Sequence, residues 1–227
     1  MKKGFLLLVV SMLVFSAAAM ADPIVIDTVN AAWKNAKDEN GTARQAWIIN
    51  GGNTVRWGGS GSYSSYIWNS TPTELYATPG VAFSLGTFTH DNRALSTSYL
   101  ALGSVNLDIT VGTFDNSTTI STLFDFAHNE TPNSGRDPRD IVTISEFFFN
   151  ELITVDGKDY YFSLLGFGDN ADNLSYQYYT EENFTNNTQL WAVITPDKIP
   201  AVPEPASLAL FGSGLGILGL AAWRKKK

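Results

Sequence analysis

The sequence contains no cysteine, and only two of its 227 residues are histidine. The absence of cysteine excludes disulfides, thiol catalysis and cysteine-ligated zinc or iron–sulfur sites. Basic residues are also scarce in the middle of the chain. Six of the 15 lie at the two ends, which leaves nine against all 22 acidic residues and a charge of −13. Nucleic-acid phosphate and anionic lipid repel such a body, so we expect no nucleic-acid partner.

The N-terminus has the order of a secretory signal peptide. Two lysines precede an apolar run over residues 4–19, which is short for a full membrane span. Ala19 and Ala21 form a small-x-small cleavage site, so we expect signal peptidase to remove residues 1–21. The alternative is an uncleaved membrane anchor.

The C-terminus carries a second membrane signal. Residues Ala206 to Trp223 contain no charge over 18 positions. As a helix they would be about 27 Å long, close to the hydrocarbon thickness of a bilayer. A basic cluster follows, formed by Arg224, Lys225, Lys226 and Lys227. Such a cluster favours the cytoplasmic side, so we expect transient anchoring in the inner membrane with the body outside.

Pro203, Glu204 and Pro205 stand directly before this apolar span. The two prolines keep the segment extended and accessible to a processing enzyme. Pro-Glu-Pro, one apolar helix and a basic tail, in this order, resemble the PEP-CTERM sorting domain. The resemblance implies recognition by an exosortase, a membrane transpeptidase that cuts near Pro-Glu-Pro and passes the protein to the surface. An ordinary tail anchor with a proline-rich hinge is the alternative.

The body between the two signals has the pattern of an all-β protein. Residues 105–111 alternate between apolar and polar side chains, as in a half-buried strand. Asp156-Gly157 predicts a tight hairpin. Many short strands between Gly, Pro and Asn turns favour a β-sandwich with a jelly-roll-like topology. Only residues 30–39 have a pattern compatible with a helix, and this segment is short.

The expected organisation has four parts. Residues 1–21 are the signal peptide, and residues 22–195 form one β-sandwich domain. Residues 196–202 are a proline-containing linker, and residues 203–227 are the sorting segment, with its apolar helix at 206–223 and its basic tail at 224–227.

Both histidines lie in or beside dense polar clusters, and a third motif precedes them. The motif residues are Arg56, Trp57 and Gly58, then Thr89, His90 and Asn92, then Glu130, Thr131, Pro132 and Asn133. Together these motifs resemble the THxN family of PEP-CTERM proteins and the choice-of-anchor K domain. The resemblance covers roughly residues 50–195 and brings no established activity with it.

Two interpretations of these clusters compete, and catalysis is a weaker third. In the first, Thr, Asn and His side chains hold tight turns by hydrogen bonds to nearby backbone. In the second, six residues of the clusters converge at one end of the sandwich: His90, Asp91, Asn92, His128, Glu130 and Asp140. There imidazole with carboxylate binds a metal, or oxygen ligands alone bind calcium. The candidate metal ligands are Asp91, His128 and Asp140. Strand parity places His128 on the apolar face of Phe124 and Phe126, which favours the structural interpretation.

Three functions fit these features. We expect a non-enzymatic structural or interaction protein of the cell surface and its exopolysaccharide matrix, without a required cofactor. A carbohydrate-binding module is the first alternative, with aromatic candidates Trp33, Trp47, Trp57, Tyr63, Tyr66, Trp68, Tyr176, Tyr178 and Tyr179. A secreted hydrolase is the second, through a carboxylate pair such as Glu146 and Glu151.

Overall fold

The computed structural model describes residues 22–59, 61–71, 74–96, 99–113, 119–132, 137–145 and 150–198. The predicted signal peptide, most of the linker and the sorting segment lie outside these ranges, as do Asn133 and Glu146. Over the described ranges, no helix is both long enough and apolar enough to span a bilayer.

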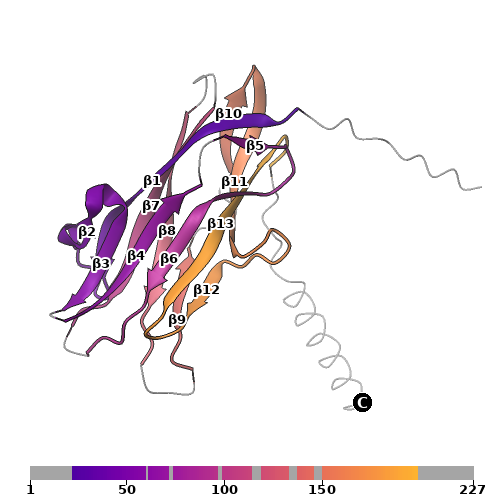
Figure 1. Cartoon of the computed structure of the whole chain (residues 1–227). Helices are drawn as coiled ribbons and strands as arrows, with labels where there is room; N and C mark the ends of the chain where they lie inside the picture. The colour runs from indigo at the N-terminus through magenta and orange to yellow at the C-terminus, as the bar shows by residue number, and fades with distance from the viewer. Residues whose placement is uncertain are drawn as a thin grey trace, which may run out of the picture.

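The described residues form two antiparallel sheets (Figure 1). The first has the strand order β12 (Gln177–Thr180), β9 (Asp140–Ile144), β8 (Thr119–Asn129), β7 (Leu102–Thr113), β1 (Ile24–Asp38) and β5 (Leu75–Ala77). The second has the order β10 (Asn150–Val155), β11 (Lys158–Gly168), β13 (Thr185–Thr195), β6 (Phe83–Asp91), β4 (Ser62–Ser70), β3 (Thr54–Gly59) and β2 (Ile48–Ile49). Two short 3-10 turns, η1 (Gln45–Trp47) and η2 (Asn50–Gly52), flank β2.

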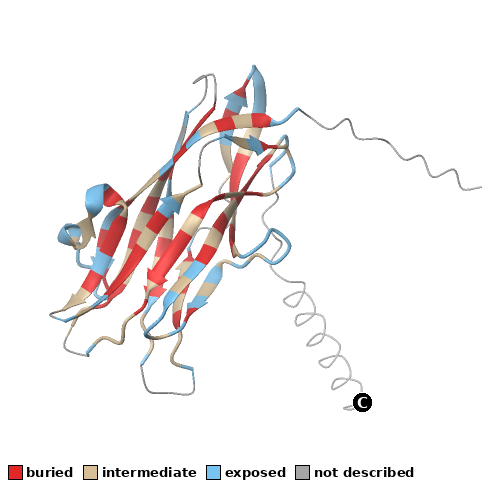
Figure 2. Ribbon diagram, viewed as in Figure 1, coloured by how far each residue is buried: buried red, intermediate tan, exposed pale blue. Residues whose placement is uncertain are grey.

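The hydrophobic core lies between the sheets. Buried and more exposed residues alternate along the strands, as the banding in Figure 2 shows. The largest fully buried side chains are aromatic: Trp33, Trp57, Trp68, Tyr66, Phe88, Phe124, Phe126 and Phe162. The all-β prediction with two packed sheets is therefore confirmed. The jelly-roll-like topology and the four-part organisation stay predictions.

Local predictions from residue alternation are largely confirmed. Val105, Leu107 and the other odd-numbered residues to Val111 are buried on β7. Asp156 and Gly157 turn the chain from β10 into β11, both with positive φ, 50° and 72°. This is the backbone that a tight two-residue hairpin requires.

The helical expectation for residues 30–39 is wrong, because residues 30–38 belong to β1 and Glu39 begins the turn after it. This strand pairs with β7, and its register shifts between Lys34 and Lys37. Asn35 has a φ of 54° at this irregularity. An inserted residue changes the parity of the buried side chains, so Val29, Trp33 and Ala36 are buried at intervals that imitate a helix.

Candidate functional site

The two histidine clusters meet at one end of the sandwich. His90 lies next to the end of β6, and His128 lies next to the end of β8. Asp140 begins β9, and Thr180 ends β12. These strand ends lie together at the lower end of the molecule in Figure 1. Antiparallel pairing thus brings side chains from both sheets to one place, although they are up to 90 positions apart in sequence.

Trp57 and Tyr66 enclose the two imidazole rings. Trp57 stacks on His90 with ring centroids 5.6 Å apart and meets His128 edge-on at 5.1 Å. The Tyr66 hydroxyl is 2.5 Å from Nδ1 of His128. This hydrogen bond joins β4 of one sheet to β8 of the other. Gly58, next to Trp57, has a φ of 107°, and an added Cβ would lie 2.7 Å from the Ser62 carbonyl oxygen.

His90 and Asn92 of the Thr-His-x-Asn segment hydrogen-bond Thr180 of the other sheet, and we call these three residues the clamp. Nδ1 of His90 is 2.9 Å from Oγ1 of Thr180, and Nδ2 of Asn92 donates to the Thr180 carbonyl oxygen at 3.3 Å. Oγ1 of Thr180 donates to the Asp140 carbonyl oxygen at 3.4 Å. We therefore assign the His90 proton to Nδ1, where it is donated to Thr180. The clamp fastens β6 to β12 across the sandwich.

His128, Glu130 and Asp140 form a compact group beside this clamp. Nε2 of His128 lies 3.1 Å from Oε2 of Glu130 and 3.9 Å from Oδ2 of Asp140. Donor atoms from the three residues all lie within 4.8 Å of one another. Thr131 donates its backbone N–H to Oδ1 of Asp140 at 2.8 Å, which leaves Oδ2 facing His128.

Burial and crowding of carboxyl groups shift the ionisation of this region. Burial raises the pKa of Asp140 to about 6. The charge of Glu130 raises this pKa as well, whereas the hydrogen bond from Thr131 lowers it. Burial also raises the pKa of Glu182 to about 7, with repulsion from Asp140 and Glu130. The pKa of His90 is held well below its ordinary value by burial and by His128, so its imidazole is neutral. Burial keeps Tyr66 protonated by raising its pKa well above 10.0.

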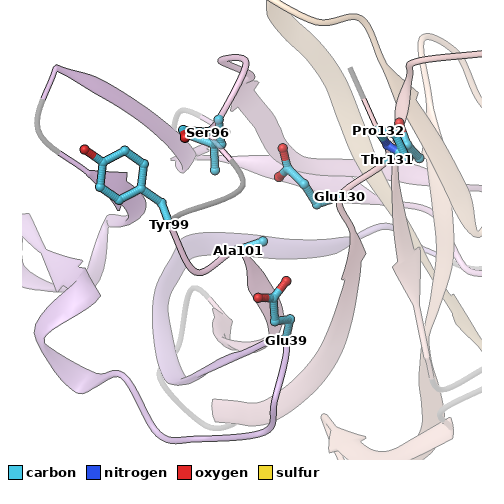
Figure 3. A pocket seen from close by; sticks show the side chains of 8 residues that line it. Glu39, Ser96, Tyr99, Ala101, Glu130, Thr131 and Pro132 are labelled. Atoms are coloured by element: carbon cyan, nitrogen blue, oxygen red, sulfur yellow. The ribbon is translucent and has the colours of Figure 1, made fainter. Parts of the chain in front are cut away.

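A cavity of about 300 Å³ opens next to the group. Its wall includes Glu130, Thr131 and Pro132 from the segment after β8, and Ser96 and Tyr99 from the segment after β6. Figure 3 shows Glu130 between Ser96 and Thr131, with Glu39 on the turn that follows β1. The carboxylate of Glu130 therefore lies between the cavity and the buried His128.

The other residues singled out in the sequence lie outside the compact group. Asp91 points away from the core, where Arg93 Nη2 contacts it at 2.8 Å. Arg56 is exposed and lies over the Tyr63 ring at 4.6 Å. Thr89 donates to Oδ1 of Asn187 at 2.7 Å. The sequence pattern missed Thr180 and Glu182, because neither carries a motif or an alternation signal of its own.

Most aromatic candidates for sugar binding are buried in the hydrophobic core or pack against it. Four of them are buried: Trp33, Trp57, Tyr66 and Trp68. Trp47, Tyr176 and Tyr178 are partly buried and pack against the core. Tyr63 and Tyr179 are 42% and 43% exposed, on β4 and β12.

Comparison with known proteins identifies the C-terminal segment. Residues 201–227 match the PEP-CTERM protein-sorting motif. No curated protein matches the chain. The motif implies an exported, membrane-transiting surface protein that an exosortase processes. The sorting prediction is thus confirmed, whereas the resemblance to the THxN family and the choice-of-anchor K domain stays a prediction.

Proposed function

We propose that the chain is a non-catalytic structural or interaction protein of the cell surface and its exopolysaccharide matrix. In this proposal, an exosortase cleaves near Pro203–Pro205 and releases the body from the inner membrane. The observation that carries the proposal is the sorting motif over residues 201–227. The acidic, cysteine-free composition supports a role in a hydrated, cation-containing matrix.

The sandwich itself supports a role that needs no catalysis. The Tyr66–His128 and His90–Thr180 hydrogen bonds join the two sheets, so buried polar groups contribute to a single rigid body. In a matrix protein such rigidity would present the outer strand faces at fixed positions.

The processing step is tested by replacing Pro203, Glu204 and Pro205 with alanine. We expect the wild-type chain to yield a shortened, surface-released product, because an exosortase reads the Pro-Glu-Pro segment. The variant should keep its full C-terminus and stay in the membrane fraction. Fragment size on immunoblots of membrane, surface and medium fractions measures this. Pro196→Ala, in the predicted linker, is the matched control and should be processed normally; unchanged processing of the triple variant would remove exosortase from the proposal.

Carbohydrate binding is the alternative molecular role, and the exposed ring of Tyr179 supports it. Arg139 lies over this ring at 5.1 Å. An exposed aromatic ring gives a sugar an apolar face to stack on, and the neighbouring guanidinium group donates hydrogen bonds to sugar hydroxyls. Under this alternative, Tyr179→Ala would abolish retention on matrix polysaccharide, while Tyr76→Ala, at another exposed tyrosine, would not. Equal retention of both variants would favour the purely structural role.

A further inference from the structure

Three donor atoms at the end of the sandwich have the spacing of ligands around a metal ion. In a tetrahedral zinc site, with metal–ligand distances of about 2.0–2.1 Å, neighbouring ligand atoms lie roughly 3.3–3.4 Å apart. The His128–Glu130 and His128–Asp140 separations of 3.1 and 3.9 Å bracket this value. The three donor atoms all lie within 4.8 Å of one another, so side-chain movements of about 1 Å bring all three to coordination distance.

Unpartnered oxygen atoms give a second, independent reason for a cation. Asp140 is 0% exposed, and its Oδ2 accepts no hydrogen bond from any described residue. Oε1 of Glu130 is also buried and has no hydrogen-bond partner within the described ranges. Leaving a buried acceptor unsatisfied costs about 1–3 kcal/mol. The Asp140 oxygen that faces His128 at 3.9 Å has no hydrogen bond to offset its burial, and a bound cation would offset it.

We propose that His128, Glu130 and Asp140 form a binding site for one divalent transition-metal cation of the zinc class. The ligand atoms are Nε2 of His128 and one carboxylate oxygen each from Glu130 and Asp140. The fourth position faces the cavity beside Glu130 and takes a water molecule or a ligand from the matrix.

The residues around this group orient the ligands. Coordination through Nε2 places the His128 proton on Nδ1, where the Tyr66 oxygen is the acceptor. Metal-bound histidines commonly donate their second N–H in this way, which fixes the ring and its tautomer. Thr131 holds Oδ1 of Asp140 through its N–H and, at 3.4 Å, its hydroxyl, so that Oδ2 is directed at the site.

The donor set selects the class of ion. Calcium prefers six to eight oxygen ligands, whereas imidazole nitrogen with two carboxylates suits zinc and its neighbours. Of the three candidate ligands named from the sequence, His128 and Asp140 belong to the site, whereas Asp91 contacts Arg93 instead. Glu130, another residue of the converging clusters, supplies the third ligand. The cavity beside Glu130 supplies the entry path.

The test is metal binding by the full chain, purified in detergent and stripped with a chelator. Titration calorimetry with ZnCl₂ should give one ion per chain, and CaCl₂ should bind at least tenfold more weakly. Glu130→Gln should weaken zinc binding tenfold or more, since it removes one ligand charge. Glu39→Gln, the same change at another residue of the same cavity, should leave the affinity within twofold of wild type.

X-ray absorption at the zinc edge of the wild-type chain provides a readout that does not depend on variant folding. It should show nitrogen and oxygen donors at about 2.0–2.1 Å. The proposal is overturned by an absence of stoichiometric zinc binding, by wild-type affinity in Glu130→Gln, by equal loss in Glu39→Gln, or by tighter binding of calcium than of zinc. None of these outcomes bears on processing at Pro203–Pro205, so the two proposals fail separately.

Discussion

The hydrogen bond between Tyr66 and His128 joins the two sheets, and its removal should cost measurable stability. Both residues are buried, and the two atoms are 2.5 Å apart. Tyr66→Phe deletes one oxygen and leaves Nδ1 of His128 without that partner, at a cost of about 1–3 kcal/mol. In a domain of this size each kcal/mol lowers the melting temperature by about 2–4 °C, so we expect a decrease of about 2–12 °C.

Thermal and guanidinium unfolding, both followed by tryptophan fluorescence, are the suitable assays, because Trp57 and Trp33 lie 4.9 and 5.7 Å from the Tyr66 ring. A chelator in all samples removes any contribution from bound metal. Tyr76→Phe, at a tyrosine that is 65% exposed, is the control and should stay within about 0.5 kcal/mol of wild type. The reasoning is refuted if Tyr66→Phe also stays within this range at an unchanged denaturant slope.

Two further perturbations test the fold away from the site. Asp38 is 2% exposed, and its pKa lies below the ordinary value of 3.8. Burial alone would raise this pKa, but hydrogen bonds from Thr42, Arg44 and Asn40 together lower it by more. Its contribution is complete above pH 3.8 and lost as the pH falls through the lowered pKa, so unfolding free energies of wild type and Asp38→Asn should converge in acid; a constant gap would contradict this. Gly166→Ala should lower the melting temperature more than Gly157→Ala. Both glycines have positive φ, but only Ala at 166 would place a Cβ 2.6 Å from the Ser175 carbonyl oxygen. Equal decreases would contradict this, because they would mean that the backbone around Gly166 moves to make room for the Cβ.

Features that depend on neighbouring residues along the chain could be predicted from the sequence. The alternation in residues 105–111 and the Asp156-Gly157 turn are such features, and strand parity correctly placed His128 on the face of Phe124 and Phe126. The Pro-Glu-Pro segment with its apolar span was equally predictable. In each case the signal lies within a few residues, where backbone geometry alone fixes which side chains share a face.

Features that depend on pairing between distant strands could not be predicted. The bulged register of β1 gave a false helical period over residues 30–39. Thr180 is the partner of both His90 and Asn92, yet it lies 90 positions from His90 in a Tyr-Thr-Glu segment that carries no motif. Asp91, a candidate cation ligand, was misplaced for a local reason: alternation turns it outward beside inward-facing His90, where Arg93 contacts it.

The structural and the cation-binding interpretations of the histidine clusters apply to different residues. His90 and Asn92 are occupied by Thr180, whereas His128 presents Nε2 to Glu130 and Asp140. The two rings are only 5.4 Å apart, so a positively charged His90 would oppose a cation at His128. His90 is fully buried and bonds Thr180 through Nδ1, so it joins the sheets without supplying a ligand to the neighbouring group. The clamp therefore holds the sheets together and leaves His128, Glu130 and Asp140 available to a metal ion.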